Sequence, residues 1–222
     1  MTAKEKFMEE KDEMKLLRMN RILASAFKLF SVKGIDTIAM TDIAKHAEIG
    51  VASLYRYYET KDEIAIRTVI WAWEKQREMI MPSLTSDEYK KLTGLDQLGV
   101  IFNQFIELYE NHQDFLRFIY FFDSYAVRNE LSKDRLADYE KIIADVQDIV
   151  NKAIDKGLED KSIRSEYRDS KLELYFATMH SFFSQCQKIS LSGHMLSIDE
   201  KSNKKAELEM LSKVLLNGIS SK

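Results

Sequence analysis

Polar and basic side chains that can contact phosphates or base edges gather in residues 41–58. Residues 41–47 and residues 51–58 each carry a short apolar stripe of helical spacing, and residues 48–50 separate them. We expect two short helices joined by a tight turn. In a helix-turn-helix the second helix lies in the DNA major groove and the first positions it on the backbone. The polar side chains left outside the apolar contact are Thr41, Lys45, Ser53, Arg56 and Tyr57.

The longer stretch TDIAKHAEIGVASLYRYYETKDEI, residues 41–64, resembles the DNA-binding signature of the TetR family. That signature has an Ile-Ala pair on the second helix, then Ala-Gly-Val-Ser, a small-Thr-Leu-Tyr group, a Tyr/His-Phe pair and Ser-Lys-Glu-x-Leu. Together with the preceding helix, the resemblance covers about residues 19–66, under a quarter of the chain. The matching positions are Ile43-Ala44, Ala47, Ala52-Ser53-Leu54-Tyr55, Tyr57-Tyr58 and Thr60-Lys61.

The resemblance implies two sets of DNA contacts. Base edges or the groove wall are implied for Ala52, Ser53 and Arg56, and phosphates for Thr41, Tyr55, Tyr57 and Lys61. An arginine guanidinium can donate to guanine O6 and N7 together, which is worth about 1–3 kcal/mol of base discrimination. A lysine in the first turn of a helix adds its charge to free N–H groups and the helix dipole, which favours a phosphate. Lys45 is placed in the same DNA-binding set, with a solvated surface charge as the alternative.

The chain departs from the family pattern at three positions. Glu48 stands where the family usually has Gly, Gly50 where it usually has Ser, and Ala39 where Thr is common. We expect Gly50 to serve the turn in place of Glu48, and the missing hydroxyls to remove phosphate contacts. Taken alone, Tyr55 is more typical of a core residue with an exposed hydroxyl. Tyr58 takes the place of the family's Phe and is assigned to the core.

The rest of the chain reads as helices. Its 222 residues are 45% hydrophobic and 31% charged, with seven Gly and one Pro, which favours an all-α fold. We expect a tail or helix extension over 1–17, a helix over 19–33 ended by Gly34, and a fourth helix that a Thr60–Glu63 capping box starts and Pro82 ends. Residues 83–91 read as a loop with at most one helical turn. Breaks near 112–114, 123–124, 157–168 and 192–194 then predict helices over about 95–111, 114–122, 125–156, 169–190 and 199–219.

This organisation predicts three parts: the segment 1–17, a three-helix helix-turn-helix domain over 18–61, and a larger helical domain over 62–222. The whole chain has a net charge of −3, but residues 14–61 hold eight basic against four acidic residues. Any DNA-binding surface is therefore local. A charged start without a signal-peptide core, a single cysteine and no long apolar run predict a cytoplasmic protein with no membrane span.

Catalytic and cofactor motifs are absent from the sequence. It has no phosphate-cradling Gly-rich loop, no Gly-x-Ser-x-Gly and no Cys-x-x-Cys, and its four histidines lack metal-ligand spacing. We therefore expect no enzyme activity, cofactor or metal. A redox role for Cys186 would need an activated thiolate and a partner, and is not favoured.

The family resemblance implies that the larger domain binds a small effector and dimerises through its last two long helices. Its dense aromatic residues fit an apolar pocket and so a largely hydrophobic ligand, with core packing as the alternative for each. The candidate ligand-binding residues are Phe105, Tyr109, Phe118, Phe122, Tyr125, Tyr175, Met179, His180 and Phe183.

The expected function is thus a repressor, homodimeric on a palindromic double-stranded DNA operator, which a ligand releases by changing the angle of the fourth helix. Two alternatives stay open. One is an effector-independent DNA-binding protein, and the other is a helical protein-interaction module whose helix-turn-helix has lost DNA binding.

Overall fold

The computed structural model describes residues 2–191 and 201–221, and within them helices are the only extended regular elements. A single isolated bridge pairs Ile163 with Ser220. The helices are α1 (Ala3–Lys33), α2 (Met40–His46), α3 (Val51–Tyr57), α4 (Lys61–Thr85), α5 (Asp87–Lys91), α6 (Gly94–Asn111), α7 (Gln113–Arg128), α8 (Lys133–Glu159), a 3-10 turn (Ser165–Asp169), α9 (Lys171–Tyr175), a π-helical segment (Phe176–His180), α10 (Ser181–Ser190) and α11 (Lys204–Ile219). None of these helices is long and apolar enough to span a membrane.

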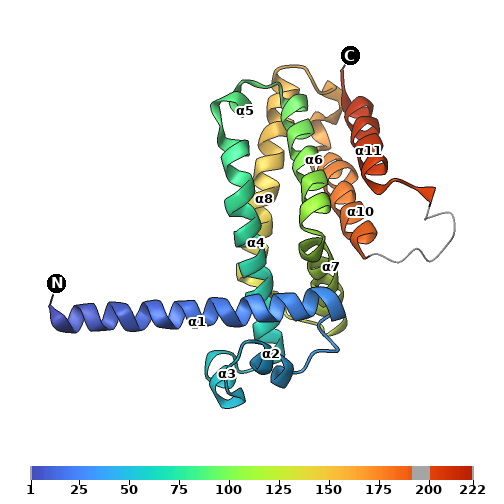
Figure 1. The fold of residues 1–222 in the computed structure, drawn as a ribbon. Coiled ribbons are helices and arrows are strands. Elements are labelled where there is room, and N and C mark those ends of the chain that lie inside the picture. Colours follow the sequence, from blue (N-terminus) through green and yellow to red (C-terminus); the bar gives the residue numbers. More distant parts are fainter. Residues whose placement is uncertain (1, 192–200, 222) are drawn as a thin grey trace.

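The first three helices form a small domain at one end of the molecule (Figure 1). Its core joins Ile22 and Phe30 of α1 to Ile43 of α2 and Leu54 of α3, all of them fully buried. The first half of α1 projects away from the rest of the protein, and its start is closed by a capping box between Thr2 and Glu5. Residues 3–17 are therefore a helix extension and not a frayed tail.

The larger domain is a bundle in which α4, α6, α7, α8, α10 and α11 run roughly along one direction (Figure 1). At the end far from α2 and α3, the backbones of α6 and α8 cross at Gly94 and Gly157. The Gly94 amide donates to Asp160 Oδ2 at 2.8 Å, and the Leu95 amide to Ser162 Oγ at 3.1 Å. Burial disfavours the ionised Asp160, but hydrogen bonds from Ser162 and the Gly94 amide outweigh it and lower its pKa. The loop after α8 thus caps the start of α6.

Two predicted boundaries are wrong. Helix α4 continues through Pro82 to Thr85, and the hydroxyls of Ser83 and Thr85 donate to the carbonyls of Ile80 and Met81 within its last turn, each at 2.8 Å. Helix α7 continues past the expected break at residues 123–124 to Arg128. The true break follows at residues 129–132. The break predicted at 192–194 lies outside the described residues, and α11 begins at Lys204.

The α6–α8 crossing predicts that alanine substitutions at two glycines have very different effects on stability. A Cβ on Gly94 would lie 2.0 Å from the Gly157 nitrogen and 2.3 Å from its Cα, so Gly94→Ala should cost about 2–3 kcal/mol of unfolding free energy. Gly218, on α11, has nothing within 4 Å of its added Cβ. Gly218→Ala should therefore be neutral or stabilise by up to about 1 kcal/mol. Urea unfolding of both variants checks this, and equal midpoints would contradict the close crossing.

Candidate functional site

The pair α2 and α3 is locked by small and apolar side chains. Ile43, Ala44 and Ala47 are buried against Leu54, and the Ile49 amide donates to the Ala44 carbonyl at 3.0 Å. The two short helices predicted from the sequence are therefore present, with the turn between them at residues 47–50.

The turn uses a residue that the sequence did not single out for it. Glu48 has φ +53°, in the left-handed region that favours glycine, and this is the position where the family usually has Gly. Gly50 instead has φ −67° and is the N-cap of α3, so the expectation that it replaces the turn glycine is wrong. The Arg21 guanidinium donates to the Glu48 carbonyl at 3.2 Å and ties the turn to α1.

The outer face of this pair carries most of the predicted DNA-contacting side chains. Tyr55 is 48% exposed, so the core placement favoured for it in isolation is wrong, whereas Tyr58 is buried as expected. Arg56 is exposed, and its Nη2 donates to Ser53 Oγ at 2.9 Å, which orients the guanidinium along α3. Thr41, Lys45 and Ala52 are exposed, while Ser53 and Tyr57 are half-buried.

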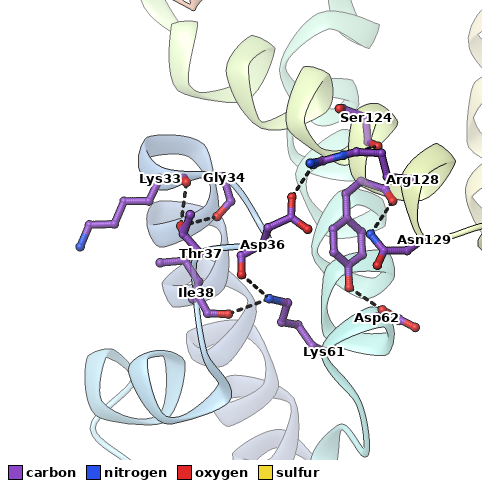
Figure 2. A network of polar contacts seen from close by, with 11 residues as sticks. Lys33, Gly34, Asp36, Thr37, Ile38, Lys61, Asp62, Ser124, Arg128 and Asn129 are labelled. Atoms are coloured by element: carbon purple, nitrogen blue, oxygen red, sulfur yellow. Dashed lines mark hydrogen bonds and ion pairs between the residues drawn. The ribbon is translucent and has the colours of Figure 1, made fainter.

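Lys61 differs from the other predicted contacts because its ammonium already has partners. Its Nζ donates to the carbonyl oxygens of Asp36 at 2.9 Å and Ile38 at 3.0 Å, in the loop between α1 and α2 (Figure 2). Lys61 therefore holds α4 to the helix-turn-helix domain. The Thr60 hydroxyl accepts from the Glu63 amide at 3.1 Å, but the Glu63 carboxylate accepts from the Glu59 amide at 2.8 Å, one residue before the position that a capping box uses.

A polar network joins the two domains at the start of α4 (Figure 2). Asp62, next to Lys61, accepts from the Tyr125 hydroxyl of α7 at 2.5 Å and pairs with Arg135 of α8 at 2.8 Å. Arg128, at the end of α7, pairs with Asp36 of the α1–α2 loop. Burial disfavours the ionised Asp62, but the Tyr125 and Arg135 contacts outweigh it and lower its pKa. We call Asp36, Lys61, Asp62, Tyr125, Arg128 and Arg135 the junction network.

Removing one hydroxyl tests the junction network. Tyr125→Phe should cost about 1.5–3 kcal/mol at pH 7, because a hydrogen bond to a charged carboxylate is lost. The lowered pKa of Asp62 means that this contribution is present above about pH 4, its unfolded pKa, and falls as the pH drops through the folded value. Denaturation of both proteins from pH 7 to pH 3 measures the difference, and a gap that stays constant with pH would contradict the charged partner.

A cavity of about 290 Å³ lies within the larger domain, between α4, α6, α7, α8 and the run from α9 to α10. Five of the nine candidate ligand residues line it: Phe105, Tyr175, Met179, His180 and Phe183. The π-helical segment carries Met179 and His180, and such segments recur at functional sites. Sequence reasoning missed other lining residues, among them Trp73, Asp123, Tyr139 and Gln187.

The other four candidates lie elsewhere. Phe118 is fully buried, with its ring centroid 5.4 Å from that of Phe27 on α1. Phe122 is also fully buried and packs on Tyr139 at 5.1 Å. Tyr125 belongs to the junction network, and the half-buried Tyr109 lies near Lys204 and Glu207 of α11. Core packing, the alternative stated for each aromatic, describes Phe118 and Phe122.

Asp123 is the charged group of the cavity wall. Asp123 is an exposed residue that lines the cavity, and its carboxylate accepts from Gln187 Nε2 at 3.2 Å and from the Tyr139 hydroxyl at 3.4 Å. Although Asp123 keeps solvent-accessible surface, desolvation by the atoms packed around it raises its pKa to about 6, and these two hydrogen bonds and the nearby His180 act in the opposite direction. Cys186 on α10 is fully buried, and burial raises its pKa to about 12, so its thiol is protonated at neutral pH.

The helix-turn-helix region matches a known family. Residues 22–68 match the family described as "Bacterial regulatory proteins, tetR family". This region is a TetR-family DNA-binding domain. Among curated proteins, the chain is 25% identical over 109 residues to the HTH-type transcriptional regulator YuxN of Bacillus subtilis, covering 49% of this chain and 34% of that protein. It is 42% identical over 50 residues to the negative regulator IcaR of Staphylococcus epidermidis, covering 22% of this chain and 27% of that protein. The matched stretches thus span about a third of these relatives.

Solved structures extend the likeness from this domain to the whole fold. FadR from Bacillus halodurans aligns with a TM-score of 0.66 at 13% identity, over 90% of this chain and 94% of that one. FadR from Bacillus subtilis in complex with stearoyl-CoA aligns with a TM-score of 0.62 at 16% identity, over 90% and 98%. NemR from E. coli, in its reduced form, gives 0.63 at 19% identity, over 92% and 98%. The fold is therefore a helix-turn-helix domain followed by a larger helical domain, as predicted.

The raised pKa of Asp123 predicts that removing its charge stabilises the protein by an amount that depends on pH. Asp123→Asn should raise the melting temperature at pH 8, because the folded protein disfavours the ionised carboxylate. Because the pKa of Asp123 is raised in the folded protein, this carboxyl stabilises the fold below its unfolded pKa of about 4. That contribution is lost as the pH rises through about 6. The gain should therefore vanish near pH 4. Thermal melts across this range measure it, with Asp148→Asn as the control, a carboxylate on α8 that pairs with Lys152 and does not line the cavity. A gain that does not depend on pH would argue against a desolvated Asp123 charge.

Proposed function

We propose that the chain is a DNA-binding transcriptional repressor that acts in the cytoplasm and leaves a palindromic operator when a small, largely hydrophobic ligand binds. The observation that carries this is the outer face of α3: Leu54 anchors the helix, while Ser53, Tyr55 and Arg56 point outward. A short anchored helix with a polar, basic outer face fits the major groove. IcaR, one of the similar proteins, is itself named a negative transcriptional regulator.

The contacts divide into base reading and positioning. Arg56, already oriented by Ser53, reads a guanine, and Ala52 lies against the groove wall. Thr41, Lys45, Tyr55 and Tyr57 contact phosphates, which fix the register without reading sequence. Lys61 contributes mainly by holding α4 against the α1–α2 loop, since two carbonyl oxygens already accept from its ammonium.

A homodimer would place two copies of α3 in successive major grooves. The surface that supports dimerisation is the run from α9 to α10 together with α11. Leu172 and Phe176 on the first, and Met210 and Val214 on the second, are large apolar side chains exposed to solvent. Apolar surface of this kind on a helical pair is typical of a subunit interface.

The ligand would act through the junction network. Asp62 and Lys61 are consecutive residues, and they bind α7 and α8 on one side and the α1–α2 loop on the other. A ligand that spreads α7 from α8 would therefore move the first turn of α4 and, with it, both copies of α3. The cavity between these helices supports a ligand at that place, and FadR of Bacillus subtilis was solved in complex with the acyl compound stearoyl-CoA.

Selection of genomic fragments by the purified protein tests the DNA-binding proposal. Two variants each remove one positive charge from the same surface. Arg56→Ala should relax the preference at one base position, at a cost of about 1–3 kcal/mol for the preferred base. Lys45→Ala should weaken binding to all sequences alike. It should also lower by about one the slope of log affinity against log salt concentration.

Enrichment of a short palindrome with this division of effects would support the regulator. A chain that enriches no fragment even at low salt would contradict it and favour the helical protein-interaction module. If the protein enriches a palindrome but no compound changes its affinity for that DNA, the result would favour an effector-independent DNA-binding protein.

A further inference from the structure

We propose that the cavity takes an organic cation with an apolar body, and that Asp123 binds its positively charged nitrogen. This inference rests on the proposed effector-binding role of the cavity. It goes further by naming the charge of the ligand, which the family fold does not determine.

The cavity wall has a negative charge and no lysine or arginine to neutralise it. Of its lining residues Asp123 alone is acidic, and His180 is the one side chain that can become positive. Asp123 forms no ion pair within residues 2–191 and 201–221. Arg77 lines the small adjoining hollow, where it pairs with Asp145 at 3.0 Å and is already neutralised. The charge of Asp123 is thus left for a ligand.

The hydrogen bonds of Asp123 leave room for a donor. Gln187 from α10 and Tyr139 from α8 each donate to one carboxylate oxygen, at 3.2 and 3.4 Å. The second of these is long, and a carboxylate has about four acceptor positions. An ammonium group entering from the cavity can donate to both oxygens. Desolvation, which raises the pKa of Asp123 to about 6 in the free protein, is then offset by the opposite charge.

The remaining wall suits the apolar body of such a cation. Trp73 and Phe183 pack at 5.6 Å between ring centroids, and Tyr139 and Tyr175 add two further rings. Aromatic faces attract cations as well as apolar groups. An anionic head placed at the same point would meet the Asp123 charge and be repelled.

Three ligands with one alkyl chain and different heads test the proposal on the full chain. Octylamine, octanol and octanoate are titrated by calorimetry at neutral pH into the wild type, Asp123→Asn and Asp148→Asn. Octylamine should bind wild type about tenfold or more tighter than octanol, and octanoate more weakly than octanol. Asp123→Asn should remove the preference for the amine and leave octanol within about twofold. Asp148→Asn, which deletes a carboxylate that does not line the cavity, should keep the wild-type order.

The pH dependence gives a second readout. The amine preference should fall as the pH drops through about 6, because Asp123 then takes up a proton. The groups that face Asp123 are Tyr139 from α8, Gln187 from α10 and His180 from the π-helical segment. A protonated His180 would also repel the cation, and any pH dependence that persists in Asp123→Asn reports that separate effect.

Three results would overturn the proposal: an amine no tighter than octanol, an amine preference that survives Asp123→Asn, or no binding of any of the three. DNA retention is measured on the same samples. If the order of the three ligands holds while the protein binds no DNA, the regulatory function fails and the cation site stands.

Discussion

Two neighbouring residues in the first turn of α4 bind the two domains, one residue to each, and the contact between the domains depends on them. Lys61 donates to carbonyl oxygens of the α1–α2 loop, while Asp62 accepts from α7 and pairs with α8. They act beside the packing of α1 on α7, where the Phe27 and Phe118 ring centroids lie 5.4 Å apart. In the proposed mechanism, the start of α4 is the point at which a change in the bundle reaches the helix-turn-helix.

Much of the fold follows from local rules that a sequence displays. The apolar spacing of Ile43, Ala44 and Leu54 predicts the helix-turn-helix, and the same residues form its buried contact. The failures have two origins. Helix α4 passes through Pro82, and the hydroxyls of Ser83 and Thr85 bond carbonyls within its last turn, which is a local effect. Glu48 holds a left-handed conformation while Arg21, far away on α1, donates to its carbonyl. A sequence does not reveal such partners.

The cavity shows the same limit more clearly. The sequence predicts a break at residues 123–124, yet Asp123 lies within α7 and lines the cavity, where Gln187 and Tyr139 donate to it. Aromatic content predicted that a pocket would exist, but periodicity could not separate its wall from the core. Phe183 lines the cavity, whereas Phe118 packs towards α1. A polar residue inside an otherwise apolar helical stretch was the signal that could have located the site.

The crossing of α6 and α8 at Gly94 and Gly157 gives the bundle a fixed pivot. The two backbones are in contact there, and the loop after α8 accepts hydrogen bonds from the start of α6, so these helices are tightly packed at that end. The helix-turn-helix lies at the opposite end, with the cavity's helices between the two (Figure 1). In the proposed mechanism, a ligand that separates α7 from α8 at the cavity would leave the α6–α8 crossing in place. The displacement would instead appear at the opposite end, where the junction network joins α7 and α8 to the start of α4.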